Sequence, residues 1–205
     1  MILAIGVDPQ PSGTAICGIL YNCHTREYVN TKIYFKKLKN TNGSVKRVVS
    51  AKYRYDIGFI VDNISTLIDD LFYTLVDDVH LTRISVMVEG QFKIAINLRL
   101  EAVITTLLYL KISQLSNTHL IDFNIVVKNG SFWQKKLKYY EENMGNYIND
   151  FTSKGNVSYY WNEITELGCD IYNDVAMING KHTRKHDMVD AYCMARLCLL
   201  DIIFI

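Results

Sequence analysis

The order of apolar and polar positions predicts a chain that begins with strands. Apolar runs at 2–7 and 15–21 are separated by a turn-rich loop, and Tyr28–Leu38 adds β-branched and aromatic residues. Short apolar runs bounded by turn residues are typical of strands, so these three predict an antiparallel meander. Ile84–Val88 and His119–Val127 predict two further strands.

Four stretches favour helices. Asp56–Asp78 keeps one apolar face at helical spacing. Ile94–Ile112 is apolar over much of its circumference, which predicts either a central core helix or a subunit interface. Ser131 is a candidate N-cap for a helix over 132–143, and a last helix opens near Asp187 and runs to about residue 200.

Length and composition predict one folded domain over residues 1–205. Hydrophobic residues make up 49% of the chain and charged residues 21%, which excludes a disordered protein. The stretches 38–56 and 145–180 fit no element well and are interpreted as insertions, the second holding one or two short helices. The five cysteines form no CxxC pair, which indicates an intracellular, reducing compartment. No run approaches the length of a transmembrane helix, so we expect no membrane partner.

The distribution of charge along the chain is more informative than the net charge, which is only +1. The stretch 28–55 contains no acidic residue but holds eight of the 22 basic residues, interleaved with aromatic side chains. Such a segment is typical of a nucleic-acid contact, and a solvated loop with incidental charge is the alternative. The candidates for nucleic-acid contact in this segment are Lys36, Lys37, Lys39, Lys46 and Arg47.

Acidic residues stand at the ends of apolar elements. Asp8 ends the first strand and Glu89 ends a later one, while Asp187 and Asp190 lie one turn apart on the last helix. A buried carboxylate is costly unless a cation or a donor compensates it, and carboxylates are the ligands that Mg²⁺ or Mn²⁺ prefers. Two such ions can clamp the attacking and leaving oxygens of a phosphoryl displacement. The alternatives are turn residues and, for Asp187, a capping role at the helix N-terminus.

The same residues resemble a known family. The run Ile5–Pro9 (I-G-V-D-P), Thr14 six residues after the aspartate, the run Val88–Gln91 and the run His186–Ala191 stand in the order of the RuvC-type Holliday-junction resolvases. That family belongs to the RNase H-like superfamily, and the E-x-Q pattern is similar to that of its viral and mitochondrial branch. The many Asn, Ile, Tyr and Lys residues and the small size suggest a large DNA virus of the poxvirus or iridovirus kind, with a phage as the alternative. Gln10 departs from the family, since many relatives have glycine there.

The resemblance implies a fold and an activity. The fold would be a mixed α/β one, with a five-stranded sheet of three antiparallel and then two parallel strands, flanked by helices. The protein would be a Mg²⁺-dependent endonuclease, with Mn²⁺ as a substitute, that resolves four-way DNA junctions by paired symmetric nicks. It would act as a homodimer without a nucleotide cofactor, and a viral protein would work where viral DNA replicates. Two ions per active site would be held by Asp8, Glu89, Asp187 and Asp190.

Further residues receive auxiliary roles from the resemblance. Thr14, Gln91 and His186 are candidates near the metal site. The remaining basic candidates for DNA contact are Lys128, Lys135, Lys136, Arg184 and Lys185. Plain surface charge is the alternative for each of these basic residues.

Three other functions compete with this interpretation. Another RNase H-like nuclease, acting on RNA–DNA hybrids or on flapped and branched DNA, would use the same acids. An actin- or sugar-kinase-like ATPase has a similar aspartate and threonine spacing, but it needs two domains and a second phosphate loop. A DNA-binding or scaffold protein with a decayed site would not need all four acids.

Overall fold

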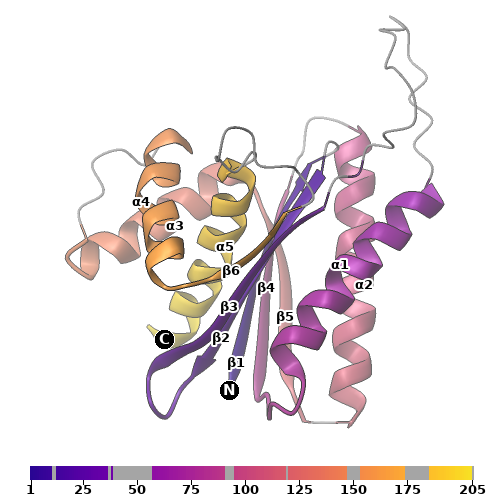
Figure 1. Ribbon diagram of the computed structural model, residues 1–205, viewed down its shortest axis with the longest axis horizontal. Coiled ribbons are helices and arrows are strands. Elements are labelled where there is room, and N and C mark those ends of the chain that lie inside the picture. The colour runs from indigo at the N-terminus through magenta and orange to yellow at the C-terminus, as the bar shows by residue number, and fades with distance from the viewer. Residues whose placement is uncertain are drawn as a thin grey trace, which may run out of the picture.

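The computed structural model describes residues 1–10, 13–36, 38, 57–90, 95–118, 120–146, 153–173 and 185–204. Three strands come first, and helices and strands follow, alternating except for two consecutive helices, α3 and α4 (Figure 1). In chain order they are β1 (Ile2–Gln10), β2 (Gly13–Asn22), β3 (Glu27–Lys36), α1 (Ile57–Val76), β4 (Arg83–Glu89), α2 (Ala95–Thr118), β5 (Asp122–Lys128), α3 (Gly130–Asn143), α4 (Ser153–Glu166), β6 (Asp170–Asn173) and α5 (Lys185–Ile203).

The sheet is mixed and has the order β5-β4-β1-β2-β3-β6. The pairs β1/β2 and β2/β3 are antiparallel, whereas β1/β4 and β4/β5 are parallel. The expected order of three antiparallel and two parallel strands is therefore confirmed. The expected count of five is wrong, because β6 adds a sixth strand parallel to β3. This strand is four residues long and half polar, so it carries no apolar run that could have predicted it.

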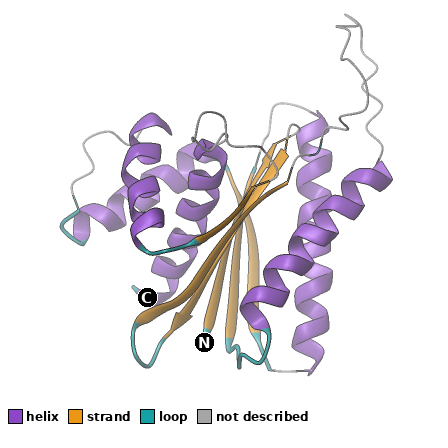
Figure 2. Cartoon of the chain, in the orientation of Figure 1, coloured by secondary structure: helices purple, strands orange, loops and turns teal. Residues whose placement is uncertain are grey.

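Helices cover both faces of the sheet (Figure 2). On one face, α1 and α2 pack through a core that includes Leu71 and Ile104. On the other face, α5 lies across the central strands with α3 and α4 beside it, and nearly every residue from Met188 to Leu200 is buried. The functional end of the molecule depends on this second layer, because α5 brings its first turn to the end of β1.

The helix α2 combines the two alternatives predicted for its apolar sequence. Leu100, Ile104 and Leu108 recur every four residues and are buried against the sheet. Leu98 and Tyr109 are 42% and 55% exposed, so apolar surface also faces outward. One side of α2 is core, and the other side is available for contact with another molecule.

Two boundaries differ from the sequence prediction. The N-cap of α3 is Asn129, whose Oδ1 accepts a hydrogen bond from the Phe132 amide at 2.8 Å. The predicted cap, Ser131, is instead inside the helix and donates to the same Asn129 oxygen. The other difference concerns α2, which continues to Thr118, so β5 begins at Asp122 rather than at the predicted His119.

The part of 145–180 that the structure describes is built into the fold. The expected helix is α4, which buries Tyr160, Trp161 and Ile164 in the core shared with α5. The other stretch interpreted as an insertion, 38–56, lies outside the described residues apart from the buried Leu38. Among the described residues, no helix has the length and apolar character needed to cross a membrane.

A buried ionic cluster, here called the Arg196 network, ties α3, α4 and α5 together. Arg196 donates through Nε to Glu141 Oε1 and through Nη1 to Glu163 Oε1, each at 2.6 Å. Tyr160 adds a hydrogen bond to Glu141, and Tyr192 adds one to Glu163. Glu163 Oε2 is buried without a hydrogen-bond partner among the described residues. The network is otherwise paired, which identifies it as a structural element that seats α4.

Candidate active site

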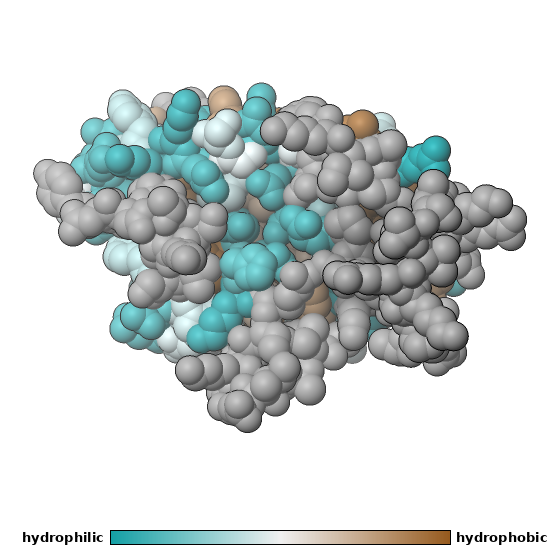
Figure 3. Space-filling view, turned by 90° about the horizontal axis from the view of Figure 1, so that it is seen from above, coloured by the Kyte–Doolittle hydropathy of each residue, from teal (hydrophilic) through white to brown (hydrophobic). Residues whose placement is uncertain are grey.

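The end of the sheet at which β1 and β4 finish carries the acidic residues. These strands are parallel neighbours in register up to Val7 and Val88, so Asp8 and Glu89 follow at adjacent positions. Both point to the α5 side, because alternate residues such as Ala4 and Met87 pack in the core on that side. Seen from this end, hydrophilic side chains gather in the middle of the face (Figure 3).

The helix α5 approaches β1 closely because of Gly6. A β-carbon at this position would lie 2.0 Å from the Ala191 carbonyl oxygen and 2.5 Å from the Ala195 nitrogen. Only glycine leaves room for the helix backbone, and this close approach places Asp187 and Asp190 beside Asp8. The sequence alone does not reveal this requirement, because Gly6 lies within an apolar run that predicts only a strand.

The four carboxylates lie close enough to perturb one another. Asp8 is 2% exposed, and burial raises its pKa well above the ordinary value. The charges of Glu89, Asp187 and Asp190 raise this pKa further, as does a hydrogen bond between the side chains of Asp8 and Glu89. Burial, followed by the charges of Glu89 and Asp187, raises the pKa of Asp190 to about 8. The structure therefore brings together all four acids that the sequence singled out.

A divalent cation fits the chemistry of this cluster. All four side chains are hard oxygen donors, and Asp190 Oδ1 is buried without a hydrogen-bond partner among the described residues. In the part of the chain described, no group of three or more His, Cys, Asp or Glu side chains is arranged as a finished metal site. The role of the four acids as ligands stays a prediction.

Asp187 occupies the first turn of α5, as predicted, and is 2% exposed. His186 Nε2 lies 3.0 Å from Asp187 Oδ1, while the imidazole itself is more than half exposed. The histidine thus stands between solvent and the cluster. The auxiliary role of His186 stays a prediction.

Two other auxiliary residues have different outcomes. Thr14 is fully buried, but it shares its face of β2 with Ile16, which packs in the core on the α1 and α2 side. Strand alternation therefore directs Thr14 away from Asp8, so any influence on the acids would pass through the sheet. Gln91 lies outside the described residues.

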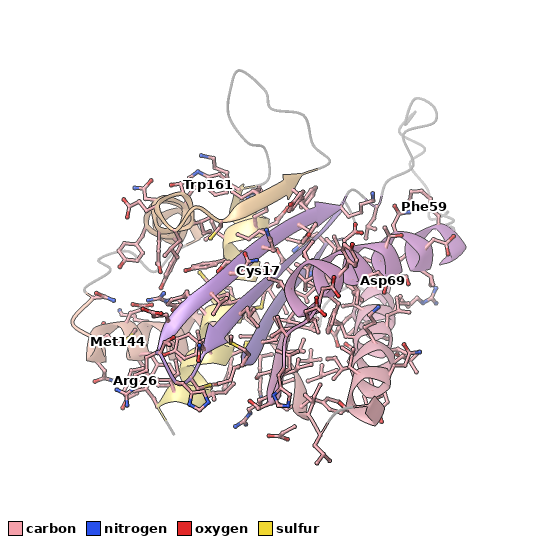
Figure 4. The ribbon with its side chains drawn as sticks, turned by 60° about the horizontal axis from the view of Figure 1, so that its bottom comes forward. Cys17, Arg26, Phe59, Asp69, Met144 and Trp161 are labelled. Atoms are coloured by element: carbon pink, nitrogen blue, oxygen red, sulfur yellow. The ribbon has the colours of Figure 1, made fainter. Side chains whose placement is uncertain are left out.

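The predicted basic contacts are spread over the molecule. Lys128 pairs with Glu89 in the register of β4 and β5, and its ammonium lies 4.8 Å from the centre of the Phe132 ring. Lys185 opens α5 and lies over the Trp161 ring at 4.4 Å, and Figure 4 shows Trp161 on α4. Lys36 ends β3 at the same end of the sheet.

Of the other basic candidates, the two that the structure describes are not placed beside the acids. Lys136 pairs with Asp201 near the C-terminal end of α5, at 2.7 Å, and is therefore directed away from the cluster. Lys135 is exposed on α3. The remaining candidates lie outside the described residues and are Lys37, Lys39, Lys46, Arg47 and Arg184.

Two side chains that contact the acids were not predicted. Gln10 donates an amide hydrogen bond to Asp8 Oδ1 at 3.1 Å, so the residue that departs from the family pattern touches the first aspartate. Trp133 of α3 donates from Nε1 to Glu89 Oε1 at 3.3 Å. The spacing of Asp8 and Gln10, two residues apart on one strand face, could have indicated the first contact. No sequence signal indicates the second.

Comparison with known proteins gives structural matches only. No protein-family model matches the chain, and no curated protein matches it. The yeast mitochondrial Holliday junction resolvase Ydc2 is similar over 97% of this chain and 78% of its own, with 16% identity and a TM-score of 0.49. RuvC of T. thermophilus in complex with a Holliday junction substrate is similar over 98% and 96%, with 8% identity and a TM-score of 0.49. The human cytomegalovirus terminase nuclease domain is similar over 98% and 84%, with 14% identity and a TM-score of 0.45.

At these identities and TM-scores, the likenesses carry no argument about what this chain binds or does. The strand pairing itself confirms the mixed sheet between helices that was expected. The solved structures that this chain resembles include two Holliday junction resolvases and a viral terminase nuclease domain.

Proposed function

We propose that this chain is a divalent-metal-dependent endonuclease that cleaves branched DNA and that its substrate is the four-way junction. The observation that carries this proposal is the meeting of four carboxylates from β1, β4 and α5. Burial and mutual repulsion raise the pKa of Asp8 and of Asp190 there. A protein gains nothing in stability from such a cluster, so a cation that neutralises it is the simplest reason for its presence.

Each residue of the cluster has a task in this proposal. Asp8, Glu89, Asp187 and Asp190 would hold Mg²⁺ or Mn²⁺. Bound there, the cations supply charge stabilisation for an in-line displacement at phosphorus. The Gln10 amide keeps Asp8 Oδ1 in place.

Basic residues at the same end support a nucleic-acid substrate. Lys128 is the register partner of Glu89. Lys36 is the last residue of β3, and Lys185 is the first residue of α5. Phosphate contacts of this kind position DNA without reading its sequence. The basic residues of 37–47 follow directly on β3, and we propose that they extend this contact.

A homodimer would supply two such sites for paired nicks. We propose that it forms through the outward face of α2, where Leu98 and Tyr109 are exposed and lie three helical turns apart on one side. A two-fold contact between copies of this face would cover both residues. In sedimentation experiments the wild type should be a dimer and Tyr109→Glu a monomer; a wild-type monomer that makes paired nicks would contradict this part.

The decisive experiment uses a four-way junction labelled on both strand pairs. With Mg²⁺, we expect symmetric nicks in opposed strands, no cleavage in EDTA, and none with Asp8→Asn. A flap, a plain duplex and an RNA–DNA hybrid form the comparison panel. Preferential cleavage of the hybrid would show that the substrate is an RNA–DNA hybrid and not the junction. Unchanged cleavage by Asp8→Asn would refute the metal site.

A further inference from the structure

The first turn of α3 is shaped around the carboxylate of Glu89. Trp133 donates its indole N–H to Glu89 Oε1 at 3.3 Å. Gly130, one turn earlier on the same side of α3, faces the same oxygen, because a β-carbon there would lie 2.6 Å from it. One residue supplies a donor and the other supplies space, so the two together define where this carboxylate can sit.

The donor itself is held rigidly. Trp133 is fully buried in the core that α3 shares with α5, next to Leu137 one turn further along the helix. Gly130 is not among the glycines with positive φ, so the space beside Glu89 accounts for glycine here and the backbone conformation does not. A side chain locked by packing can fix the orientation of a carboxylate that a mobile one could not.

We propose that Trp133 is a positioning residue, which orients Glu89 for cation binding from a helix that contributes no ligand of its own. This inference rests on the proposed function, since the orientation matters only if the carboxylates bind a cation. Groups that hydrogen-bond to metal ligands in this way change metal affinity or activity by about 10- to 100-fold when they are removed. The competing explanation is that a buried indole N–H simply needs an acceptor.

Two variants separate these explanations, and the readout is Mn²⁺ affinity, obtained from the free Mn²⁺ that electron paramagnetic resonance detects. Trp133→Phe removes the donor and keeps an aromatic ring, and we expect Mn²⁺ to bind about 10- to 100-fold more weakly. Leu137→Ala is the matched control, because it damages the same core without touching Glu89. Its Mn²⁺ affinity should equal that of the wild type. Equal weakening by Leu137→Ala and Trp133→Phe would overturn the proposal.

Gly130→Ala tests the space beside Glu89 without removing the donor. Alanine favours a helix more than glycine does, and the atom that it meets is the end of a flexible side chain, so the fold should be unaffected. We expect weaker Mn²⁺ binding with an unchanged melting temperature. Wild-type affinity in this variant would mean that the position of Glu89 is not controlled from α3.

Fluorescence gives a readout that does not require Trp133 to be replaced. In Trp161→Phe, Trp133 is the sole tryptophan, because the chain has only two. We expect Mn²⁺ to change its emission in this background and to leave it unchanged when Asp8→Asn is added. If the emission of Trp133 does not change with Mn²⁺ while the protein binds Mn²⁺ and cuts DNA, the positioning role is contradicted but the proposed function is not. A wild type that neither binds Mn²⁺ nor cuts DNA would refute both.

Discussion

Two clusters of buried charge lie on the same helix and are built in opposite ways. The acidic cluster at the first turn of α5 consists of Asp8, Glu89, Asp187 and Asp190. Arg196, at the centre of the Arg196 network, follows Asp190 by six residues, about 9 Å along the helix axis. Both bring carboxylates from separate elements into the interior.

The difference lies in compensation. In the Arg196 network, one guanidinium stands between Glu141 and Glu163, and two tyrosines donate to the same carboxylates. In the acidic cluster, the charges that act on Asp190 are those of other carboxylates, and its pKa rises to about 8. The compensated cluster holds helices together, whereas the uncompensated one is where the proposed cations would bind.

The largest effect should come from the acidic cluster. Asp190→Asn should lower Mg²⁺-dependent junction cleavage by about 10³-fold or more, because a ligand of the reacting centre is lost. Above pH 8, without metal, the free energy of unfolding of the same variant should be about 2 kcal/mol higher than that of the wild type, because a buried charge is gone. Cleavage rates and urea denaturation measure the two effects.

Asp201→Asn is the control for that variant, because Asp201 lies near the other end of α5 and pairs with Lys136. It should cut DNA at the wild-type rate. A destabilised Asp190→Asn protein would show that the acidic cluster is compensated after all.

A substitution in the Arg196 network should lower the free energy of unfolding, whereas Asp190→Asn should raise it. Arg196→Met leaves the fully buried Glu141 without its cation, which should cost about 3–5 kcal/mol of unfolding free energy. Urea denaturation measures this loss, while Mn²⁺ affinity of the folded protein should stay the same.

Arg83→Met provides the comparison, because the pair of Arg83 and Asp122 is exposed and its loss should cost less than about 1 kcal/mol. If Arg196→Met does not fold, Tyr28→Phe removes the hydroxyl oxygen that accepts a hydrogen bond from Arg196 Nη1, which should cost about 1 kcal/mol. A Tyr28→Phe protein as stable as the wild type would weaken the structural interpretation.

The smallest effect is a dependence of metal-free stability on pH. Asp190 has a pKa of about 8 in the folded protein, against 3.8 for an ordinary aspartate, so the folded state binds more protons between these limits. The stability that this group contributes should therefore be fully present below about pH 4 and should fall as the pH rises through 8. We expect a loss of about 2 kcal/mol. Roughly 1.36 kcal/mol for each pKa unit would give a larger loss over the whole shift, but Asp190 keeps some contact with water, which reduces it.

Thermal denaturation in EDTA from pH 5 to pH 9 measures this slope, and Asp190→Asn should flatten it. Mg²⁺ should raise the melting temperature more at pH 8 than at pH 6, because it competes with protons for the same oxygens. A wild-type slope equal to that of the variant would place the titration elsewhere.

The sequence predicted the elements whose pattern is local and strong. Periodicity identified α1 and α2, and short apolar runs identified β1 to β5 with the acids at their ends. It did not reveal β6, which is short and half polar, or the Arg196 network, whose members are ordinary surface residue types. Gln10 and Trp133 were missed because their contacts with the acids exist only once the strands and α3 are packed. The N-cap of α3 is Asn129 and not Ser131, which lies two residues later. Asn and Ser are both favoured at this position, so residue preference does not decide between them.

If the cluster binds a cation as proposed, the glycine at position 6 has a consequence for which ion it accepts. Asp8 is fixed to a strand and Asp187 and Asp190 to a helix, so the gap between the two backbones sets how far apart the oxygens are. Calcium and magnesium differ in their oxygen distances by about 0.3–0.5 Å. The chain controls a distance of this size through the absence of one methyl group from β1, rather than through any of the four acids.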